Sequence, residues 1–531
     1  MNTTECLEIA SLIAPDRLAV IFEKNRLTYE VIVERINRLA TALIRLGIQR
    51  SDRVAIIQVN TNEHIETYFA VAKLDAVFVP LNFRSKEDEL TYMINVSGAK
   101  IVLAGPRYRD LILPIIHKLN TVEHFISLED DTDVTCDSLN LPTNWQSYET
   151  LIANASQYEG YPESDGDDLS IIMFTAGTTG SPKGVMLSHE SFTSYILDNV
   201  APIDPDTEER NILTVPLYHI AGVQAMMAAI YGGRTLVIQR QFDSSAWIEL
   251  VEREKVDRAM IVPTMLKQIL DNPDFASRDL SSLRVITYGA APMPLEIIKK
   301  AIVAFPDTHF INAFGQTETA ATISMLPPEA HVLTGSPSEV EIKVKRLASI
   351  GKPLPDIDIK IVDEEGKSVS IGEIGEIVAR GPRVMKGYWK EENATKETVR
   401  DGWLHTGDLG YFDDEGYIFL SGRAKDFIKR GGEMISPEEV EQVLQSHPAV
   451  DEAAIIGIPD PEWGERVRAI VVVKRNAVLT EREIIEYCRQ NLSSFKKPES
   501  VIFEKKLPRN SLGKVLKRVL RESYSHPISC S

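Results

Sequence analysis

Two patterns of apolar residues alternate from the N-terminus to about residue 165. Short apolar runs, Arg53–Ile57 and Val77–Leu81, predict buried strands, whereas Val31–Leu46 and Glu66–Leu74 carry apolar residues near helical spacing. Strands that alternate with helices form a parallel sheet with the helices on its faces. The pattern therefore predicts an α/β scaffold, and no charged constellation in this part indicates catalysis.

Farther along the chain, apolar runs end in turns of small or hydroxyl residues. Four segments share this pattern: Ile171–Gly184, Val215–Gly222, Arg284–Met293 and Phe310–Thr319. Each predicts a strand that ends in a close turn, where glycine lets the backbone approach a ligand. The second of these segments also opens a helix that is rich in Ala, Gly and Met.

The pattern changes again near Ser421–Lys429. Before it, residues 350–377 predict a strand-rich subdomain and Asp413–Tyr417 predicts a hairpin turn. After it, two helices and two strands predict a small α+β domain: Pro437–Leu444, Ala454–Ile458, Ala469–Val473 and Glu483–Leu492. We therefore expect an N-terminal domain over residues 1–422, a hinge over 423–428 and a C-terminal domain over 429–531.

The composition is typical of a soluble protein with more than one domain. The chain has 531 residues, of which 44% are hydrophobic and 25% are charged, and it is too long for one compact core. Its net charge of −19 argues against nucleic acid or an anionic membrane surface as the main partner. Four scattered cysteines without a C-x-x-C pair disfavour a disulfide framework or a zinc site. We expect no signal peptide, no transmembrane segment and a cytoplasmic location.

The loop Thr175–Gly184 holds the densest candidate chemistry in the chain. It contains three glycines, Gly177, Gly180 and Gly184, and its hydroxyls and Lys183 are hydrogen-bond donors. Such a loop suits a polyphosphate, because backbone N–H groups and a lysine can surround it. It is not a Walker-type loop, because Lys183 is followed by glycine rather than by Ser or Thr. The alternative interpretation is a flexible surface loop.

This loop resembles the phosphate loop of the adenylate-forming superfamily, which includes acyl-CoA synthetases, luciferases and the adenylation domains of peptide synthetases. Asn312–Glu318 resembles the Asn-x-Tyr-Gly-x-Thr-Glu motif of that superfamily, with Phe314 in place of the frequent tyrosine. Thr406–Asp408 and Asn510–Lys514, which matches Asn-x-x-Gly-Lys, follow in the expected order. The resemblance covers nearly the whole chain, which looks most like the fatty-acid CoA ligases.

The resemblance implies a fold and a set of nucleotide-binding residues. The fold is α/β: a large N-terminal domain of stacked α/β sheets with a small β-barrel-like subdomain, then a small mobile α+β C-terminal domain. Asp408 and Arg423 are suited to ribose hydroxyls, and Phe314 is suited to stacking on adenine. The residues implied to bind ATP or AMP are Thr175, Ala176, Gly177, Thr178, Thr179, Gly180, Lys183, Gly289, Ala290, Ala291, Asn312, Ala313, Phe314, Gly315, Thr317, Asp408, Arg423 and Lys514.

The resemblance also implies the catalytic residues Lys514, Thr317, Glu318 and His219, with Glu318 as a ligand of Mg²⁺. It places the acyl pocket at five residues: His219, Ile220, Gly222, Val223 and Met226. Two alternatives stay open for this region. His219 is structural in the first, and Ile220–Met227 forms a tightly packed core helix in the second.

The implied reaction has two steps with ATP and CoA as co-substrates. A carboxylate attacks the α-phosphate, pyrophosphate leaves, and the C-terminal domain then rotates about Lys425. Gly431 and Gly432 move in to face CoA, whose thiol takes the acyl group and releases AMP. Acetylation of Lys514 would remove its charge and block the first step.

The acyl group is predicted less sharply than the reaction. No basic residue lies in Ile220–Met227, which favours a medium- or long-chain fatty acid, with an aryl acid as the second candidate. Transfer to a carrier protein instead of CoA is an alternative, and a non-catalytic nucleotide or acyl binder is another. Chain length cannot be read from the sequence, and a homodimer is left open.

Overall fold

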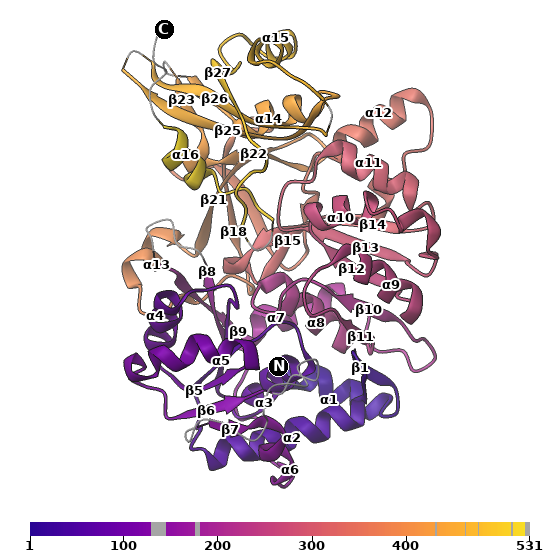
Figure 1. Ribbon diagram of the computed structural model, residues 1–531, viewed down its shortest axis with the longest axis vertical. Coiled ribbons are helices and arrows are strands. Elements are labelled where there is room, and N and C mark those ends of the chain that lie inside the picture. The colour runs from indigo at the N-terminus through magenta and orange to yellow at the C-terminus, as the bar shows by residue number, and fades with distance from the viewer. Residues whose placement is uncertain are drawn as a thin grey trace.

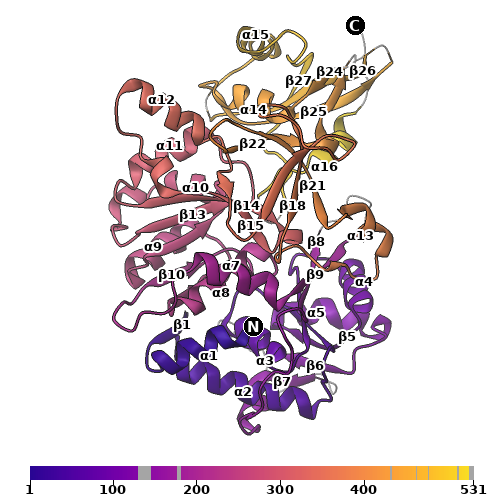
Figure 2. The ribbon, with the colours of Figure 1, turned by 180° about the vertical axis from the view of Figure 1, so that it is seen from behind.

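The structure, a computed structural model, describes residues 1–128, 145–175, 181–430, 433–461, 463–475, 477–510 and 513–525. It confirms the predicted α/β class, with a large N-terminal part built on sheets and a smaller C-terminal part. Figures 1 and 2 show the N-terminal elements at the bottom, the middle of the chain beside them and the C-terminal elements at the top. No helix within these ranges is long and apolar enough to cross a membrane.

The first sheet has eight strands in the order β19-β9-β8-β4-β3-β5-β6-β7. Its strands are β3 (Arg53–Ile57), β4 (Val77–Leu81), β5 (Ala99–Ala104), β6 (His124–Ser127), β7 (Trp145–Ser147), β8 (Leu169–Thr175), β9 (Lys183–Ser188) and β19 (Gly387–Tyr388). Its helices are α2 (Tyr29–Arg45), α3 (Asn62–Lys73), α4 (Glu87–Ser97), α5 (Pro106–Ile112) and α6 (Tyr148–Ala153). Strands β3 to β7 pair in parallel, as the alternating pattern predicted.

The predicted start of α3 was wrong. The helix begins at Asn62, four residues before Glu66, where apolar periodicity placed it. The first turn carries Asn62, Glu63 and His64, which are polar yet buried. A rule based on apolar spacing does not detect a helix end of this kind.

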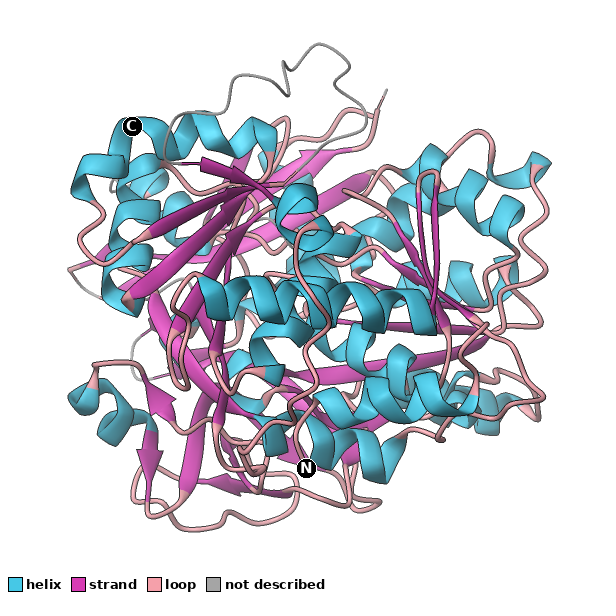
Figure 3. Ribbon diagram, turned by 90° about the horizontal axis from the view of Figure 1, so that it is seen from below, coloured by secondary structure: helices cyan, strands magenta, loops and turns pink. Residues whose placement is uncertain are grey.

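The second sheet has nine strands in the order β16-β15-β14-β13-β12-β10-β11-β1-β2. Its strands are β1 (Leu18–Phe22), β2 (Asn25–Thr28), β10 (Arg210–Leu213), β11 (Thr235–Ile238), β12 (Arg258–Ile261), β13 (Val285–Gly289), β14 (His309–Gln316), β15 (Ala321–Leu326) and β16 (Lys352–Pro353). Its helices are α7 (His189–Asn199), α8 (Ile220–Tyr231), α9 (Ser244–Glu254), α10 (Pro263–Leu270), α11 (Leu295–Ala304) and α12 (Pro337–Arg346). Apolar side chains of α8 and of α1 (Thr4–Ile13) join one core with residues of both large sheets. Figure 3 shows helices lying against the strands of the sheets.

A third sheet fulfils the prediction of a strand-rich subdomain. Its strands are β17 (Asp358–Val362), β18 (Gly375–Arg380), β20 (Val399–Arg400), β21 (Trp403–Phe412) and β22 (Ile418–Arg423), and α13 (Glu392–Thr398) lies beside it. The predicted hairpin turn at Asp413–Tyr417 joins β21 and β22. The chain then passes through a short 3₁₀ helix, η5 (Ala424–Asp426), into another sheet. The assignment of residues 423–428 as a hinge stays a prediction.

The C-terminal part is an α+β unit around a fourth sheet. Its strands are β23 (Ile428–Arg430), β24 (Glu433–Ile435), β25 (Val450–Asp460), β26 (Gly464–Val473) and β27 (Ser500–Phe503). Its helices are α14 (Pro437–Gln445), α15 (Glu481–Asn491) and α16 (Lys517–Tyr524). Two apolar clusters are built largely on this sheet, one with α14 and α15 and the other with α16. Four short 3₁₀ helices complete the described elements: η1 (Leu113–Lys118), η2 (Phe275–Ser277), η3 (Thr317–Thr319) and η4 (Pro328–His331).

Candidate active site

The loop that resembles a phosphate loop joins two paired strands, β8 and β9. Thr175 ends β8 and stands opposite Lys183, the first residue of β9. The Lys183 Nζ lies 5.0 Å from the ring centroid of Tyr388, over the ring face. The residues between them in the loop, Ala176, Gly177, Thr178, Thr179 and Gly180, lie outside the described residues.

The turn after β13 and the neighbouring strand β14 approach each other closely. Gly289 pairs with Ala313, and a Cβ at Gly289 would overlap the carbonyl oxygen of Ala313. Ala290 follows with a φ of 64°, in the left-handed region that residues other than glycine seldom adopt. Asn312 donates from Nδ2 to the carbonyl oxygen of Ser349 at 3.2 Å. The fold therefore brings the candidate turn Gly289–Ala291 beside the candidate strand segment Asn312–Gly315, which includes the aromatic ring of Phe314.

Glu318 lies in η3, directly after β14, and faces the same tyrosine as Lys183. The hydroxyl of Tyr388 donates to Glu318 Oε1 at 3.0 Å. Burial raises the pKa of the Glu318 carboxyl above its usual range, and the hydrogen bond from Tyr388 offsets part of that rise. Tyr388 on β19 thus links the ammonium of Lys183 to the carboxylate that follows Thr317. The sequence analysis did not single out this tyrosine.

Asp408, Arg423 and Lys514 come from three segments and form one charged cluster. Asp408 on β21 pairs in register with Arg423 on β22, and their side chains form an ion pair of 2.6 Å. Burial raises the pKa of Asp408, although Arg423 and Lys514 both oppose the rise. The Lys514 side chain reaches solvent, yet many protein atoms lie near its ammonium, so desolvation lowers its pKa, and repulsion from Arg423 lowers the pKa further.

The loop of Lys514 rests against the N-terminal part of the molecule. Gly513 has a φ of 76°, and a Cβ there would overlap the Thr264 hydroxyl on α10. The backbone N–H of Lys514 donates to Asn510 Oδ1 at 2.8 Å. A second link between the two parts is the ion pair of 3.2 Å between Lys267 on α10 and Asp451 on β25. This arrangement brings Lys514 to Asp408, about a hundred residues earlier in the chain.

His219 caps the start of α8 and lies against aromatic rings. Its ring centroid is 4.2 Å from that of Tyr218, which in turn lies 5.2 Å from the ring of Phe83. Burial lowers the pKa of His219 to about 3, and the nearby charge of Arg84 contributes. The imidazole is therefore neutral near pH 7, and it is a weak base that can accept a hydrogen bond.

The other predicted acyl-pocket residues lie along α8. Ile220, Val223 and Met226 belong to the apolar core between the two large sheets, and the last two are each 1% exposed. A Cβ at Gly222 would overlap the carbonyl oxygen of Pro216, so this glycine allows the helix to start close to the preceding turn. Their assignment to an acyl pocket remains a prediction.

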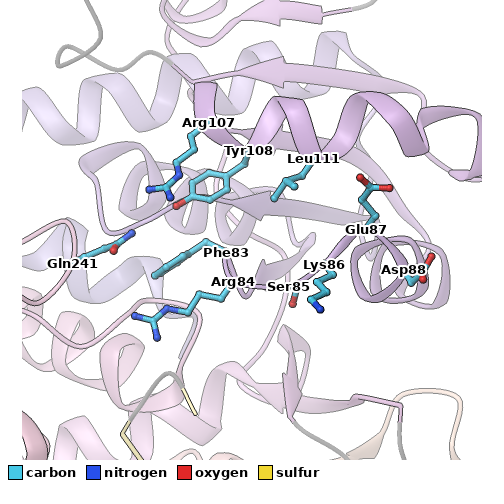
Figure 4. A pocket seen from close by; sticks show the side chains of 10 residues that line it. All are labelled: Phe83, Arg84, Ser85, Lys86, Glu87, Asp88, Arg107, Tyr108, Leu111 and Gln241. Carbon is cyan, nitrogen blue, oxygen red and sulfur yellow. The ribbon is translucent and has the colours of Figure 1, made fainter. Parts of the chain in front are cut away.

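A cavity of about 680 Å³ lies beside Phe83, the ring that contacts Tyr218 (Figure 4). Ten residues line it: Phe83, Arg84, Ser85, Lys86, Glu87, Asp88, Arg107, Tyr108, Leu111 and Gln241. Its three cations, Arg84, Lys86 and Arg107, follow the ends of β4 and β5, the two parallel strands that flank β3 in the sheet. The sequence analysis found no chemistry in this region, although two basic residues within five positions after β4 and one three positions after β5 were a usable signal.

Lys425 lies in η5, exposed to solvent. Desolvation lowers the pKa of its ammonium, and the adjacent Asp426 opposes the shift. Asp426 forms an ion pair of 2.8 Å with Arg521 of α16. A cavity of about 460 Å³ opens beside Lys425, between Phe427, Lys429, Gly464 and Glu465. The predicted CoA-facing residues, Gly431 and Gly432, lie outside the described residues.

Two family profiles match successive parts of the chain. The profile of the AMP-binding enzyme family matches residues 9–389, and that of the AMP-binding enzyme C-terminal domain matches residues 439–514. The chain belongs to the AMP-binding enzyme family. This AMP-binding enzyme is an AMP-forming acid–CoA ligase, as the resemblance predicted.

Two curated relatives of this AMP-binding enzyme differ in the acid that their names give. The long-chain-fatty-acid–CoA ligase FadD13 of Mycobacterium tuberculosis is 34% identical over 503 residues, which cover 94% of this chain and 93% of that protein. A feruloyl-CoA synthase of Amycolatopsis sp. is 34% identical over 514 residues, 96% of each chain. Among solved structures, the anthranilate CoA ligase AuaEII in complex with anthranoyl-AMP gives a TM-score of 0.87 at 25% identity, covering 98% of this chain and 97% of that one.

Proposed function

We propose that this enzyme joins an apolar carboxylic acid to CoA through an acyl-adenylate, with release of pyrophosphate and AMP. One observation carries the proposal: Lys514, from the C-terminal part, lies in the cluster with Asp408 and Arg423. A lysine delivered from one part of the molecule to a carboxylate of the other suits a site that closes over a nucleotide. We assign Asp408 and Arg423 to the ribose and Lys514 to the reacting groups.

The first step brings a carboxylate against the α-phosphate of ATP, so two anions must approach. A carboxylate oxygen forms a bond to phosphorus, and the bond from phosphorus to the pyrophosphate oxygen breaks. Lys183, Lys514 and the hydroxyl of Thr317 would stabilise the charge that develops on the phosphoryl oxygens. No covalent bond to the protein is needed.

Glu318 is the residue suited to Mg²⁺. Within the described ranges, no group of three or more His, Cys, Asp or Glu side chains is placed to hold a metal ion. A single carboxylate fits Mg²⁺ only when phosphate oxygens and water complete the coordination, as they would with ATP bound. Bound Mg²⁺ neutralises phosphate charge, while Tyr388 orients the Glu318 carboxylate through its hydrogen bond.

The second step needs a place for CoA, and the 680 Å³ cavity supplies one. Arg84, Lys86 and Arg107 give it three cations, which suit the phosphates of a nucleotide. The rings of Phe83 and Tyr218 connect the cavity to the neutral imidazole of His219. A thiol that enters from the cavity would meet this imidazole, which can orient the thiol through a hydrogen bond but is too weak a base to take its proton near pH 7. Rotation about Lys425, with Gly431 and Gly432 moving toward CoA, stays part of the proposal.

We propose a medium- or long-chain fatty acid as the acyl substrate, with an aryl acid as the second candidate. Support comes from α8, whose stretch from Ile220 to Met227 holds no charged residue. The two relatives named above include one enzyme of each kind. A carrier protein in place of CoA is the alternative acceptor.

The test is formation of AMP and acyl-CoA from MgATP and CoA, with fatty acids of increasing length, benzoate and cinnamate. Lys514→Ala should lower acyl-adenylate formation by about 10²–10³, because one preorganised cation is lost from the transition state. AMP formation without acyl-CoA would indicate a carrier protein as acceptor. Equal rates in the variant and the wild type would contradict the role of Lys514.

A separate test addresses the CoA cavity. Arg84→Ala should raise the KM for CoA by about tenfold or more, since one charge-assisted hydrogen bond to phosphate is lost. Pantetheine carries the same thiol without phosphates, so its KM should not change. Acid-dependent exchange of pyrophosphate into ATP, which needs no CoA, should also stay at the wild-type rate. An equal rise in the KM for CoA and in the KM for pantetheine would show that Arg84 acts on folding or on His219 instead.

A further inference from the structure

Gln224 is a buried polar residue on α8 that the reaction scheme does not use. Its side chain faces β15, where the hydroxyl of Thr322 donates to its Oε1 at 3.0 Å. Gln224 is 7% exposed, and its Nε2 has no hydrogen-bond partner among the described residues. Buried polar groups in proteins are nearly always paired, so an unpaired amide at this position needs a reason.

Gln224 lies between the two segments that carry the candidate chemistry. On one side it is five residues after His219, on the same helix. On the other side its partner Thr322 pairs in register with Gly315, within the β14–β15 hairpin whose turn holds Thr317 and Glu318. Gln224 thus joins the helix of the predicted acyl pocket to the hairpin that carries Thr317 and Glu318.

The contact that orients Gln224 is itself held in place by buried charges. Arg383, which is fully buried, donates to the carbonyl oxygen of Thr322. Its guanidinium forms an ion pair of 2.8 Å with Asp356, which also accepts from Ser194 at 2.8 Å. Thr322 is therefore fixed, and its hydroxyl directs the Gln224 Oε1 toward β15 and leaves Nε2 for another acceptor. The opposite amide orientation would leave Oε1 unpaired instead, so a hydroxyl group satisfies either orientation.

We propose that Gln224 is a specificity-determining residue that binds a neutral oxygen of the acyl group, a hydroxyl or a carbonyl. The proposal rests on the ligase function proposed above and sharpens its substrate class from a plain hydrocarbon acid to an oxygen-bearing one. A second carboxylate does not fit, because Arg383, the cation that supports Thr322, is already neutralised by Asp356. A site that presents a buried amide discriminates strongly against an analogue that lacks the matching group.

The experiment measures discrimination within pairs of acids that differ by one oxygen. The pairs are cinnamate with 4-hydroxycinnamate, 3-phenylpropionate with its 4-hydroxy derivative, and decanoate with hydroxydecanoates substituted along the chain. The readout is kcat/KM for acid-dependent exchange of pyrophosphate into ATP, which does not depend on CoA. In the wild type, at least one oxygen-bearing acid should exceed its parent by about tenfold or more.

Gln224→Leu keeps the size of the side chain and removes the amide. It should bring the ratio of kcat/KM between the two acids of a pair to about one, mainly because kcat/KM for the oxygen-bearing acid falls. The KM for ATP should not change. Thr322→Val removes the orienting hydroxyl and should lower the same ratio by a smaller factor. Gln239→Leu is the matched control: Gln239 is also buried, and its Nε2 donates to the Asp243 carbonyl at 2.9 Å. The control should leave the ratio unchanged, even if thermal unfolding shows a loss of stability.

The outcomes separate the inference from the function on which it rests. Exchange with hydrocarbon acids but no preference for an oxygen-bearing partner in any pair would overturn the role of Gln224 and leave the ligase function standing. A preference that survives Gln224→Leu would do the same and would indicate that only water meets the Nε2. Absence of exchange with every acid would overturn the proposed function together with this inference.

Discussion

Lys514 combines two demands that oppose each other. A lysine that stabilises phosphoryl oxygens must be protonated, yet desolvation and the neighbouring Arg423 lower its pKa from the ordinary value. A lowered pKa means that the charge disappears at a lower pH than in an exposed lysine. The kcat/KM for adenylation should therefore fall on the alkaline side, below pH 10.5, as Lys514 loses its proton.

Arg423→Gln tests this assignment of the alkaline limb. The substitution removes the repulsion from Arg423, while Asp408 and Asp426 still attract Lys514 against the weaker repulsion from Lys425, so the pKa of Lys514 rises. The limb should move to higher pH, even though weaker nucleotide binding lowers the overall kcat/KM. The measurement is the pH profile of pyrophosphate exchange in both proteins. A limb that stays in place, or moves to lower pH, would assign the titration to another group.

At the scale of elements, the sequence predicted best what is local. The apolar run before Thr175 predicted β8, and the small residues after Tyr288 predicted the close turn at Gly289, because each depends on a few adjacent residues. Apolar spacing failed at the start of α3, where Glu63 is buried without being apolar. The order of strands in each sheet could not be predicted from local patterns either, because β19 pairs with β9 although some two hundred residues separate them.

The candidate site shows the same limit more sharply. Motif resemblance supplied Lys183 and Glu318 separately, but their meeting at Tyr388 depends on β19, which carries no motif. Arg84 and Gln224 were missed for a related reason. A lone arginine after a strand, or a lone glutamine in an apolar helix, gains meaning only when the fold sets it beside a cavity or an unpaired amide.

At the scale of the whole molecule, the two parts meet at the loop of Lys514. The contact is close because Gly513 has no side chain: a Cβ there would overlap the Thr264 hydroxyl. Its φ of 76° adds a backbone cost for any other residue, about 1–2 kcal/mol. Gly513→Ala should therefore push the loop away from α10 and withdraw Lys514 from Asp408. A rotated arrangement, in which this loop has left α10, would escape the overlap.

The two half-reactions should consequently respond differently to Gly513→Ala. Pyrophosphate exchange should fall by about tenfold or more, given the backbone cost and the added overlap. Conversion of supplied acyl-adenylate and CoA to acyl-CoA should change far less. Gly416→Ala is the matched control, because Gly416 has a φ of 82° in a hairpin turn with no atom near the added Cβ. Thr264→Ala, combined with Gly513→Ala, should restore part of the exchange by removing the overlapping hydroxyl. Equal losses in both half-reactions would mean that the loop keeps its contact with α10 throughout the cycle, and rotation about Lys425 would then have no role.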